Sequence, residues 1–121
     1  MPVTGRDFIS LQVRDMERSA AFYEQFLGLT RQPGPPHAVV FDTKPVAFTV
    51  RDVVAGVDLD SIAQPGQGMA LWMHATEVQA IHDALSAARF PIILAPMDGP
   101  FGRTFTFADL DGYHVTLHDR A

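Results

Sequence analysis

Alternating apolar and polar residues open the chain, and a helical pattern follows them. Residues 8–13 alternate with period two, which is typical of a strand with one buried face. Apolar residues between Ala20 and Leu27 recur at helical spacing, so a helix is predicted there. Asp15 is placed to N-cap this helix, and Gly28 to end it in the left-handed conformation. Three extended stretches, separated by turns that contain proline, follow at 29–32, 37–42 and 46–51.

The same order of elements begins again near residue 69. A strand over 69–74 precedes a helix that Thr76 would cap, with an apolar stripe from Val78 to Ala88. An extended stretch at 92–96, a turn at 97–100 and strands at 104–108 and 113–118 complete the second half. The pattern predicts β-α-β-β-β twice, an α+β fold whose 121 residues suit one domain. Module one covers about 5–52, a connection with a short helical turn covers 53–66, and module two covers about 67–120.

Composition and charge narrow the classes of function. The net charge is -5 without clusters of Lys and Arg, which argues against nucleic acid as a partner. The absence of cysteine excludes disulfides, thiolate metal sites and cysteine nucleophiles. No apolar run is long enough for a membrane span, and the N-terminus does not resemble a signal peptide. We therefore expect a cytoplasmic protein without a membrane partner.

Two motifs resemble a known superfamily. The segment Val13-Arg14-Asp15-Met16-Glu17-Arg18-Ser19-Ala20-Ala21-Phe22-Tyr23-Glu24-Gln25-Phe26-Leu27-Gly28-Leu29 is similar to the opening of vicinal oxygen chelate proteins. These include glyoxalase I, extradiol dioxygenases, fosfomycin-modifying enzymes and bleomycin-resistance proteins. Asp109-Leu110-Asp111-Gly112-Tyr113 resembles their late Asp-Pro-Asp-Gly-aromatic turn, with Leu110 in place of proline. The resemblance implies two curled mixed sheets around a concave cup, with the helices on the convex side.

Metal-dependent members of this superfamily hold a divalent ion with His and Glu residues in the cup. The matching positions here hold Phe8, Phe48 or Thr49, Gly68 or Met69, and Thr116. None is a histidine or a carboxylate, the ligands that such an ion needs. The resemblance therefore implies a branch without metal or other cofactor, similar to the bleomycin-resistance proteins, and argues against metal-dependent glyoxalase or dioxygenase activity.

Strand alternation predicts which side chains line the cup. If the apolar sets face the helices, the opposite faces carry the candidate ligand-binding residues Phe8, Ser10, Gln12, Phe48, Trp72, His114, Thr116 and His118. Arg103, beside the expected rim, could clamp an anionic group, although a solvated arginine is the commoner case. Aromatic walls with a few polar groups suit a planar ligand. Alternatively, the aromatic residues pack together and plug the cup.

Three functions follow from this set of residues. The first is a homodimeric protein that sequesters an aromatic antibiotic or metabolite. The second is a metal-free isomerase or lyase with His74 or His114 as general base. The third is a degenerate domain with a structural or regulatory role. If the first and last strands of module two pair antiparallel, His74 falls near His114, and with His118 these residues could hold zinc; polar residues at strand ends are the simpler interpretation.

Overall fold

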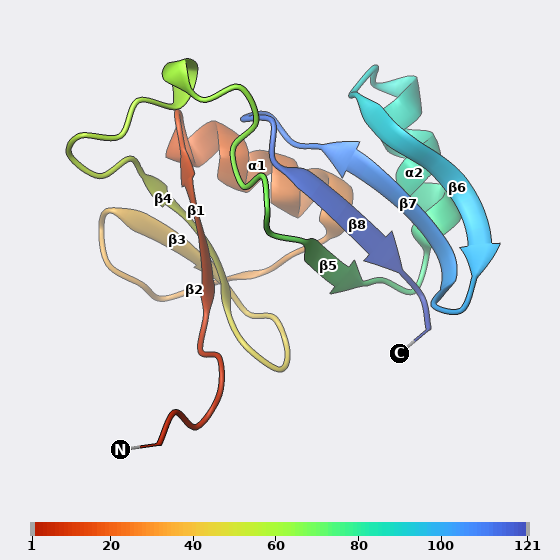
Figure 1. Ribbon diagram of the computed structural model, residues 1–121, viewed down its shortest axis with the longest axis horizontal. Helices are drawn as coiled ribbons and strands as arrows, with labels where there is room; N and C mark the ends of the chain where they lie inside the picture. Colours follow the sequence, from red (N-terminus) through yellow and green to blue (C-terminus); the bar gives the residue numbers. More distant parts are fainter. Residues whose placement is uncertain (1, 121) are drawn as a thin grey trace. The chain divides into compact units, whose positions relative to one another are not determined.

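The computed structural model describes residues 2–120 (Figure 1). These residues form two helices and eight strands, arranged as two four-stranded mixed sheets. The chain divides into two compact units, with the boundary between Leu59 and Asp60. Each unit has the order β-α-β-β-β, which confirms the α+β fold and the repeat predicted from the sequence. A single 3₁₀ turn, η1 (Leu59–Ser61), lies at the boundary.

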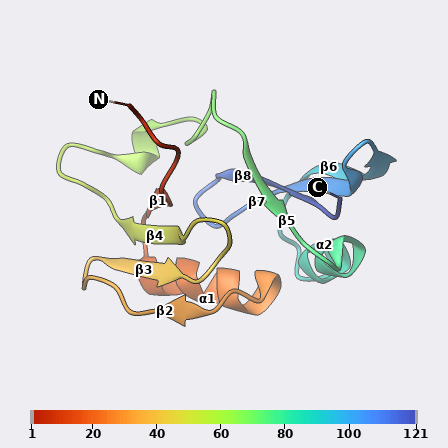
Figure 2. The ribbon, with the colours of Figure 1, turned by 90° about the horizontal axis from the view of Figure 1, so that it is seen from below.

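Unit 1, up to Leu59, contains one helix and one sheet. Its elements are β1 (Ile9–Val13), α1 (Met16–Leu27), β2 (Arg31–Gln32), β3 (Ala38–Phe41) and β4 (Phe48–Asp52). The strand order is β1-β4-β3-β2, with β1 parallel to β4 and the other pairs antiparallel. Helix α1 packs against β3 and β4 and covers one face of the sheet (Figure 2). The opposite face, here called the helix-free face, carries the candidate site.

Local signals explain the position of α1. The Asp15 carboxylate accepts a hydrogen bond from the Arg18 N–H at 3.1 Å, and Gly28 ends the helix with φ of 70°. The buried ring of Tyr23 packs against Phe48 with ring centroids 4.9 Å apart. On the surface, Arg31 of β2 bonds two glutamates of α1, at 3.0 and 2.9 Å. These hydrogen bonds raise the pKa of Arg31 and join the edge strand to the helix.

Unit 2, from Asp60, repeats this arrangement. Its elements are β5 (Leu71–His74), α2 (Val78–Ala87), β6 (Ile92–Gly99), β7 (Gly102–Ala108) and β8 (His114–His118). The strand order is β5-β8-β7-β6, with β5 parallel to β8. Phe105 of β7 meets His82 of α2 with ring centroids 5.3 Å apart, so Phe105 marks the face of the sheet that α2 covers. The residues paired alongside it, including Leu117 of β8, share that face.

Two local predictions in unit 2 were wrong. Glu77, and not Thr76, occupies the N-cap of α2, and its side chain makes no capping hydrogen bond. Thr76 lies two residues before the first helical residue, which is one position too early for a cap. The expected turn at 97–100 is instead the end of β6, because residues 97–99 pair with residues 102–104 of β7 in a hairpin.

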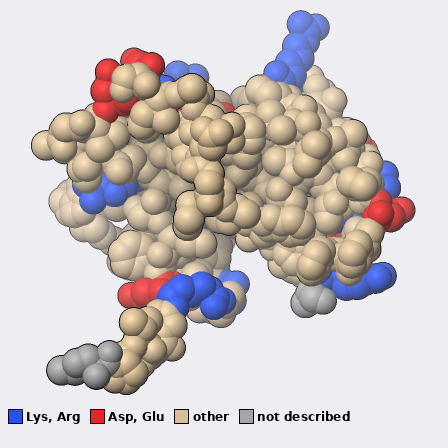
Figure 3. Space-filling view, in the orientation of Figure 1, with Lys and Arg blue, Asp and Glu red and all other residues tan. Residues whose placement is uncertain are grey.

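The surface is mostly uncharged on the face that Figure 3 shows. There, Lys and Arg form small groups that are scattered among similarly small groups of Asp and Glu. Within residues 2–120, no helix combines the length and the apolar character that a membrane crossing requires.

Candidate functional site

The helix-free face of unit 1 is defined by the pairing of its three longer strands. Thr49 of β4 lies beside Ser10 of β1 and Val40 of β3, and Arg51 lies beside Gln12 and Ala38. Paired residues of neighbouring strands point to the same side of a sheet. All six side chains therefore lie on the face opposite α1. Gln12 has a structural role there, because its Oε1 accepts a hydrogen bond from the Val54 N–H at 2.8 Å.

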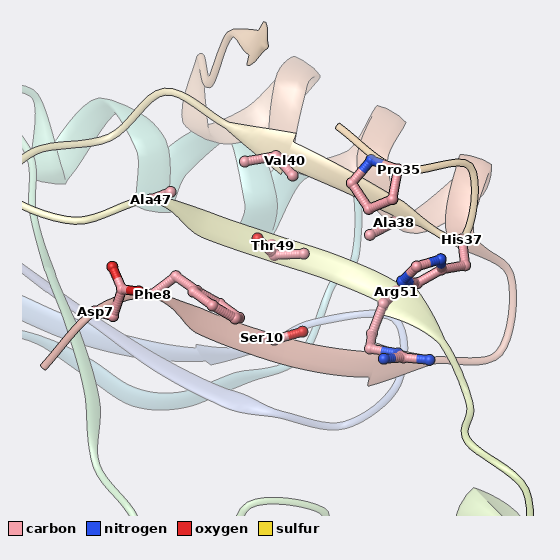
Figure 4. A pocket seen from close by; sticks show the side chains of 10 residues that line it. All are labelled: Asp7, Phe8, Ser10, Pro35, His37, Ala38, Val40, Ala47, Thr49 and Arg51. Carbon is pink, nitrogen blue, oxygen red and sulfur yellow. The ribbon is translucent and has the colours of Figure 1, made fainter. Parts of the chain in front are cut away.

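A pocket of about 380 Å³ lies on this face (Figure 4). This volume is in the range of small-molecule sites, about 300–1,000 Å³. The pocket is lined by Asp7, Phe8, Ser10, Pro35, His37, Ala38, Val40, Ala47, Thr49 and Arg51. Apolar groups form most of its wall, and Phe8 is 61% exposed. The pocket can therefore offer an aromatic surface to a ligand.

The two ends of the pocket carry opposite charges. At one end the Ile9 N–H donates to the Ala47 carbonyl at 3.2 Å, which places Asp7 and Phe8 near the start of β4. At the other end the Asp52 N–H donates to the His37 carbonyl at 3.1 Å, which places His37 beside Arg51 at the end of β4. Figure 4 shows Asp7 and Arg51 at opposite ends, with the Phe8 ring between them. The pocket is thus an apolar trough with an acidic and a basic end.

The structure contradicts the prediction that Phe48 faces the site. Phe48 is 2% exposed and lies in the core against Tyr23 and Phe41, with ring centroids 4.9 and 6.1 Å apart. Side chains alternate between the two faces along β4. Because Phe48 points toward α1, Thr49 and Arg51 point toward the pocket.

The helix-free face of unit 2 carries a cluster of aromatic rings. Trp72 of β5 meets Phe101 and His118, with ring centroids 5.4 and 5.6 Å apart. Trp72 is 47% exposed and Phe101 is 50% exposed. Thr116 of β8 lies between Trp72 of β5 and Thr106 of β7. Its hydroxyl is hydrogen-bonded to that of Thr106 at 2.7 Å. Trp72, Thr116 and His118 thus share one face with Phe101, and their role in ligand binding stays a prediction.

The histidines of unit 2 do not form the arrangement considered from the sequence. Because β5 and β8 are parallel, His74 lies opposite His118, with ring centroids 5.8 Å apart, and not opposite His114. His114 also lies on the helix-free face, where its Nδ1 is 3.3 Å from the amide nitrogen of Gln64. Among residues 2–120, no group of three His, Cys, Asp or Glu side chains is arranged to hold a metal ion.

Arg103 makes two polar contacts within unit 2. Its Nε donates to Gln79 of α2 at 3.0 Å, and its guanidinium is 3.3 Å from the Asp98 carboxylate. Alternation along β7 places Arg103 with Phe105 on the side that α2 covers. These contacts do not favour the clamp for an anionic group that was considered from the sequence, and the role of Arg103 in ligand binding stays a prediction.

The residues present do not fit the metal ion that the resemblance associates with this fold. Phe8 and Thr49 line the pocket at two of the matching positions, and Thr116 is bonded to Thr106. A phenyl ring and alcohols lack the imidazole and carboxylate donors that such ions take from proteins.

Sequence reasoning missed several residues of the two faces. Phe48 was chosen for this face, so Thr49 appeared only as its alternative at a position that matches a metal ligand, and Arg51 was missed. His37 was expected to begin the extended stretch over 37–42 and was not among the candidate residues; the structure places it one residue before β3. No local signal pointed to Phe101, which reaches Trp72 through the β6–β7 hairpin.

Comparison with known proteins extends these observations. The family model of the Glyoxalase/Bleomycin resistance protein/Dioxygenase superfamily matches residues 5–117. A comparison with curated proteins gives no match. A glyoxalase-related enzyme from Fulvimarina pelagi has a TM-score of 0.77 and 22% identity, covering 98% of this chain and 89% of its own.

Two further solved structures share the fold. A fosfomycin resistance protein from Listeria monocytogenes has a TM-score of 0.75 and 16% identity, covering 99% of this chain and 96% of its own. An antibiotic binding protein from Streptomyces sp. CB03234 has a TM-score of 0.70 and 23% identity, covering 100% of this chain and 99% of its own. Because the family model spans nearly all of the sequence and both units have the expected fold, the chain belongs to the glyoxalase/bleomycin resistance protein/dioxygenase superfamily.

Proposed function

We propose that the chain is a small-molecule binding protein that works without a metal ion and takes an aromatic antibiotic or metabolite as its ligand. The observation that carries the proposal is the chemistry of the pocket of unit 1. Its volume of about 380 Å³ suits a small molecule, and Phe8 and Thr49 stand where the resemblance leads one to expect metal ligands. The exposed Phe8 ring offers a surface for stacking in their place.

Two of the similar structures support the class of ligand. One is an antibiotic binding protein, and the other is a fosfomycin resistance protein, of which a second crystal structure contains Mn(II). The donor set described above favours the first type of relative for this chain. We further propose that the protein acts as a homodimer, which sedimentation equilibrium tests against the 13.3 kDa mass of one chain.

Titration with a panel of aromatic antibiotics tests the proposal. The protein is first dialysed against EDTA, and heats of binding are then measured by calorimetry with and without added Mn²⁺ or Zn²⁺. We expect at least one compound to bind without metal, and Phe8→Ala to weaken that binding by roughly tenfold, because stacking on one ring contributes about 0.5–1.5 kcal/mol beyond its buried area. Binding that requires an added metal, or no binding across the panel, would refute the proposal.

A second candidate function is a metal-free isomerase or lyase. One observation favours His118, and not His74 or His114, as its general base. The Nδ1 of His118 lies 2.8 Å from the Arg120 carbonyl. Since a carbonyl only accepts, Nδ1 carries the hydrogen and Nε2 of the neutral ring keeps a lone pair for a substrate proton. Loss of turnover in His118→Gln, but not in His74→Gln, would support this function; equal turnover in both variants would exclude it.

A further inference from the structure

We propose that the pocket of unit 1 selects ligands that carry a carboxylate on an aromatic ring, with the carboxylate at Arg51. This inference rests on the proposed function and adds the chemical class of the ligand and its orientation. It depends on the charge at the two ends of the pocket and on the apolar wall between them.

Arg51 provides the anion-binding group. Its Nε donates to the Asp52 carbonyl at 2.8 Å, which holds the guanidinium at the end of β4. Within residues 2–120, no carboxylate forms an ion pair with this guanidinium, so its two terminal nitrogens are available. A guanidinium edge with two N–H donors matches the two oxygens of a carboxylate.

His37 adds a second polar group at the same end. Its main-chain carbonyl is bonded to the Asp52 N–H, so the residue is fixed beside Arg51, and its ring lines the pocket. Figure 4 shows both side chains toward the same end. A ring N–H from His37 can therefore supply another hydrogen bond to the anionic group.

The middle of the pocket fits an aromatic ring. Phe8 is 61% exposed, although it lies directly before β1, a strand that ends in the buried Val13. Together with Ala38, Val40 and Ala47 it forms an apolar wall on the helix-free face. A ligand ring stacked on Phe8 would remove this exposed apolar surface from water.

The position of Asp7 sets the orientation. Ala47 and Arg51 are four residues apart on an extended chain, so the two ends are separated by about 13 Å at roughly 3.3 Å per residue. Asp7 repels a ligand carboxylate from its own end, and Arg51 attracts it to the other. The permanent positive charge at that end is the single charge of Arg51, which matches a monoanion such as a carboxylate better than a dianionic phosphate.

A pair of probes tests the inference. 2-Naphthoate and its neutral isostere 2-naphthamide are titrated into the wild-type protein, and dissociation constants are measured by calorimetry. We expect naphthoate to bind about tenfold more tightly, since a hydrogen bond to a charged group contributes about 1.5 kcal/mol or more and about 1.4 kcal/mol corresponds to tenfold. Added salt should reduce this difference.

Variants assign the preference to Arg51. Arg51→Gln should lose the preference for naphthoate while naphthamide binds as before, and Arg51→Lys should keep part of it. Arg18→Gln, on α1 at the opposite face, makes the same change of charge and should retain the preference. Equal affinity for the two probes in the wild type, or a preference that survives in Arg51→Gln, overturns the inference while leaving the proposed function standing. If neither probe binds, the inference is also overturned, and the antibiotic panel alone decides the proposed function.

Discussion

Replacing Phe48 by alanine tests the phase of β4, on which the whole assignment of the pocket depends. Phe48 is 2% exposed and packs against Tyr23 and Phe41. Removing a fully buried aromatic side chain loses about 2–3 kcal/mol of transfer free energy, and its ring contacts add about 1 kcal/mol. We therefore expect Phe48→Ala to lower the free energy of unfolding by about 3–4 kcal/mol, within the range measured for such changes in protein cores.

Phe8→Ala is the matched control, because it makes the same chemical change on the opposite face of the same sheet. Phe8 is 61% exposed, so its truncation should cost less than about 1 kcal/mol. Urea unfolding followed by far-UV circular dichroism measures both variants. Equal losses, or a larger loss for Phe8→Ala, would show that β4 has the other phase and that the pocket is assigned to the wrong side chains.

Two further predictions concern the helices. Gly28 and Arg89 both have positive φ beyond a helix end, of 70° and 64°. Gly28→Ala should therefore destabilise the protein and Arg89→Gly should stabilise it, each by about 1 kcal/mol in urea unfolding, and the same sign for both would contradict this. Hydrogen bonds lower the pKa of the Asp83 carboxyl; the larger effect comes from His82 and the smaller from Gln79. The stabilisation from Asp83 should be complete above its unfolded pKa and lost as the pH falls through the lowered folded pKa; His82→Ala should raise that pKa in a ¹³C NMR titration.

The elements of this fold could be predicted because their signals are local. Asp15 and Gly28 mark the two ends of α1 within a few residues of the hydrogen bonds that they make or allow. The repeated order of elements was visible for the same reason, since each strand or helix has its own period. Helix caps and strand periods depend on residues that are close together in the sequence, so they can be recognised from one sequence alone.

The faces of the sheets were harder to predict because they depend on partners far along the chain. From Val46 to Val50 nearly every residue is apolar or small, so alternation alone allows either phase for β4. Packing against Tyr23, half the unit away, selects the phase that buries Phe48. The parallel pairing of β5 with β8 is also a long-range choice, and it decides that His74 meets His118.

The two arginines at the centre of these assignments show how strongly strand phase controls the chemistry of a site. Arg103 and Arg51 each lie on a strand next to residues that α2 or α1 could cover. Arg103 points to the same side of β7 as Phe105. It donates a hydrogen bond to Gln79 and forms an ion pair with Asp98, both within unit 2. Arg51 has the phase opposite to Phe48, so its charge faces the pocket. An arginine therefore makes structural contacts in one unit and lines the pocket in the other, and the difference arises from the face of the sheet toward which each side chain points.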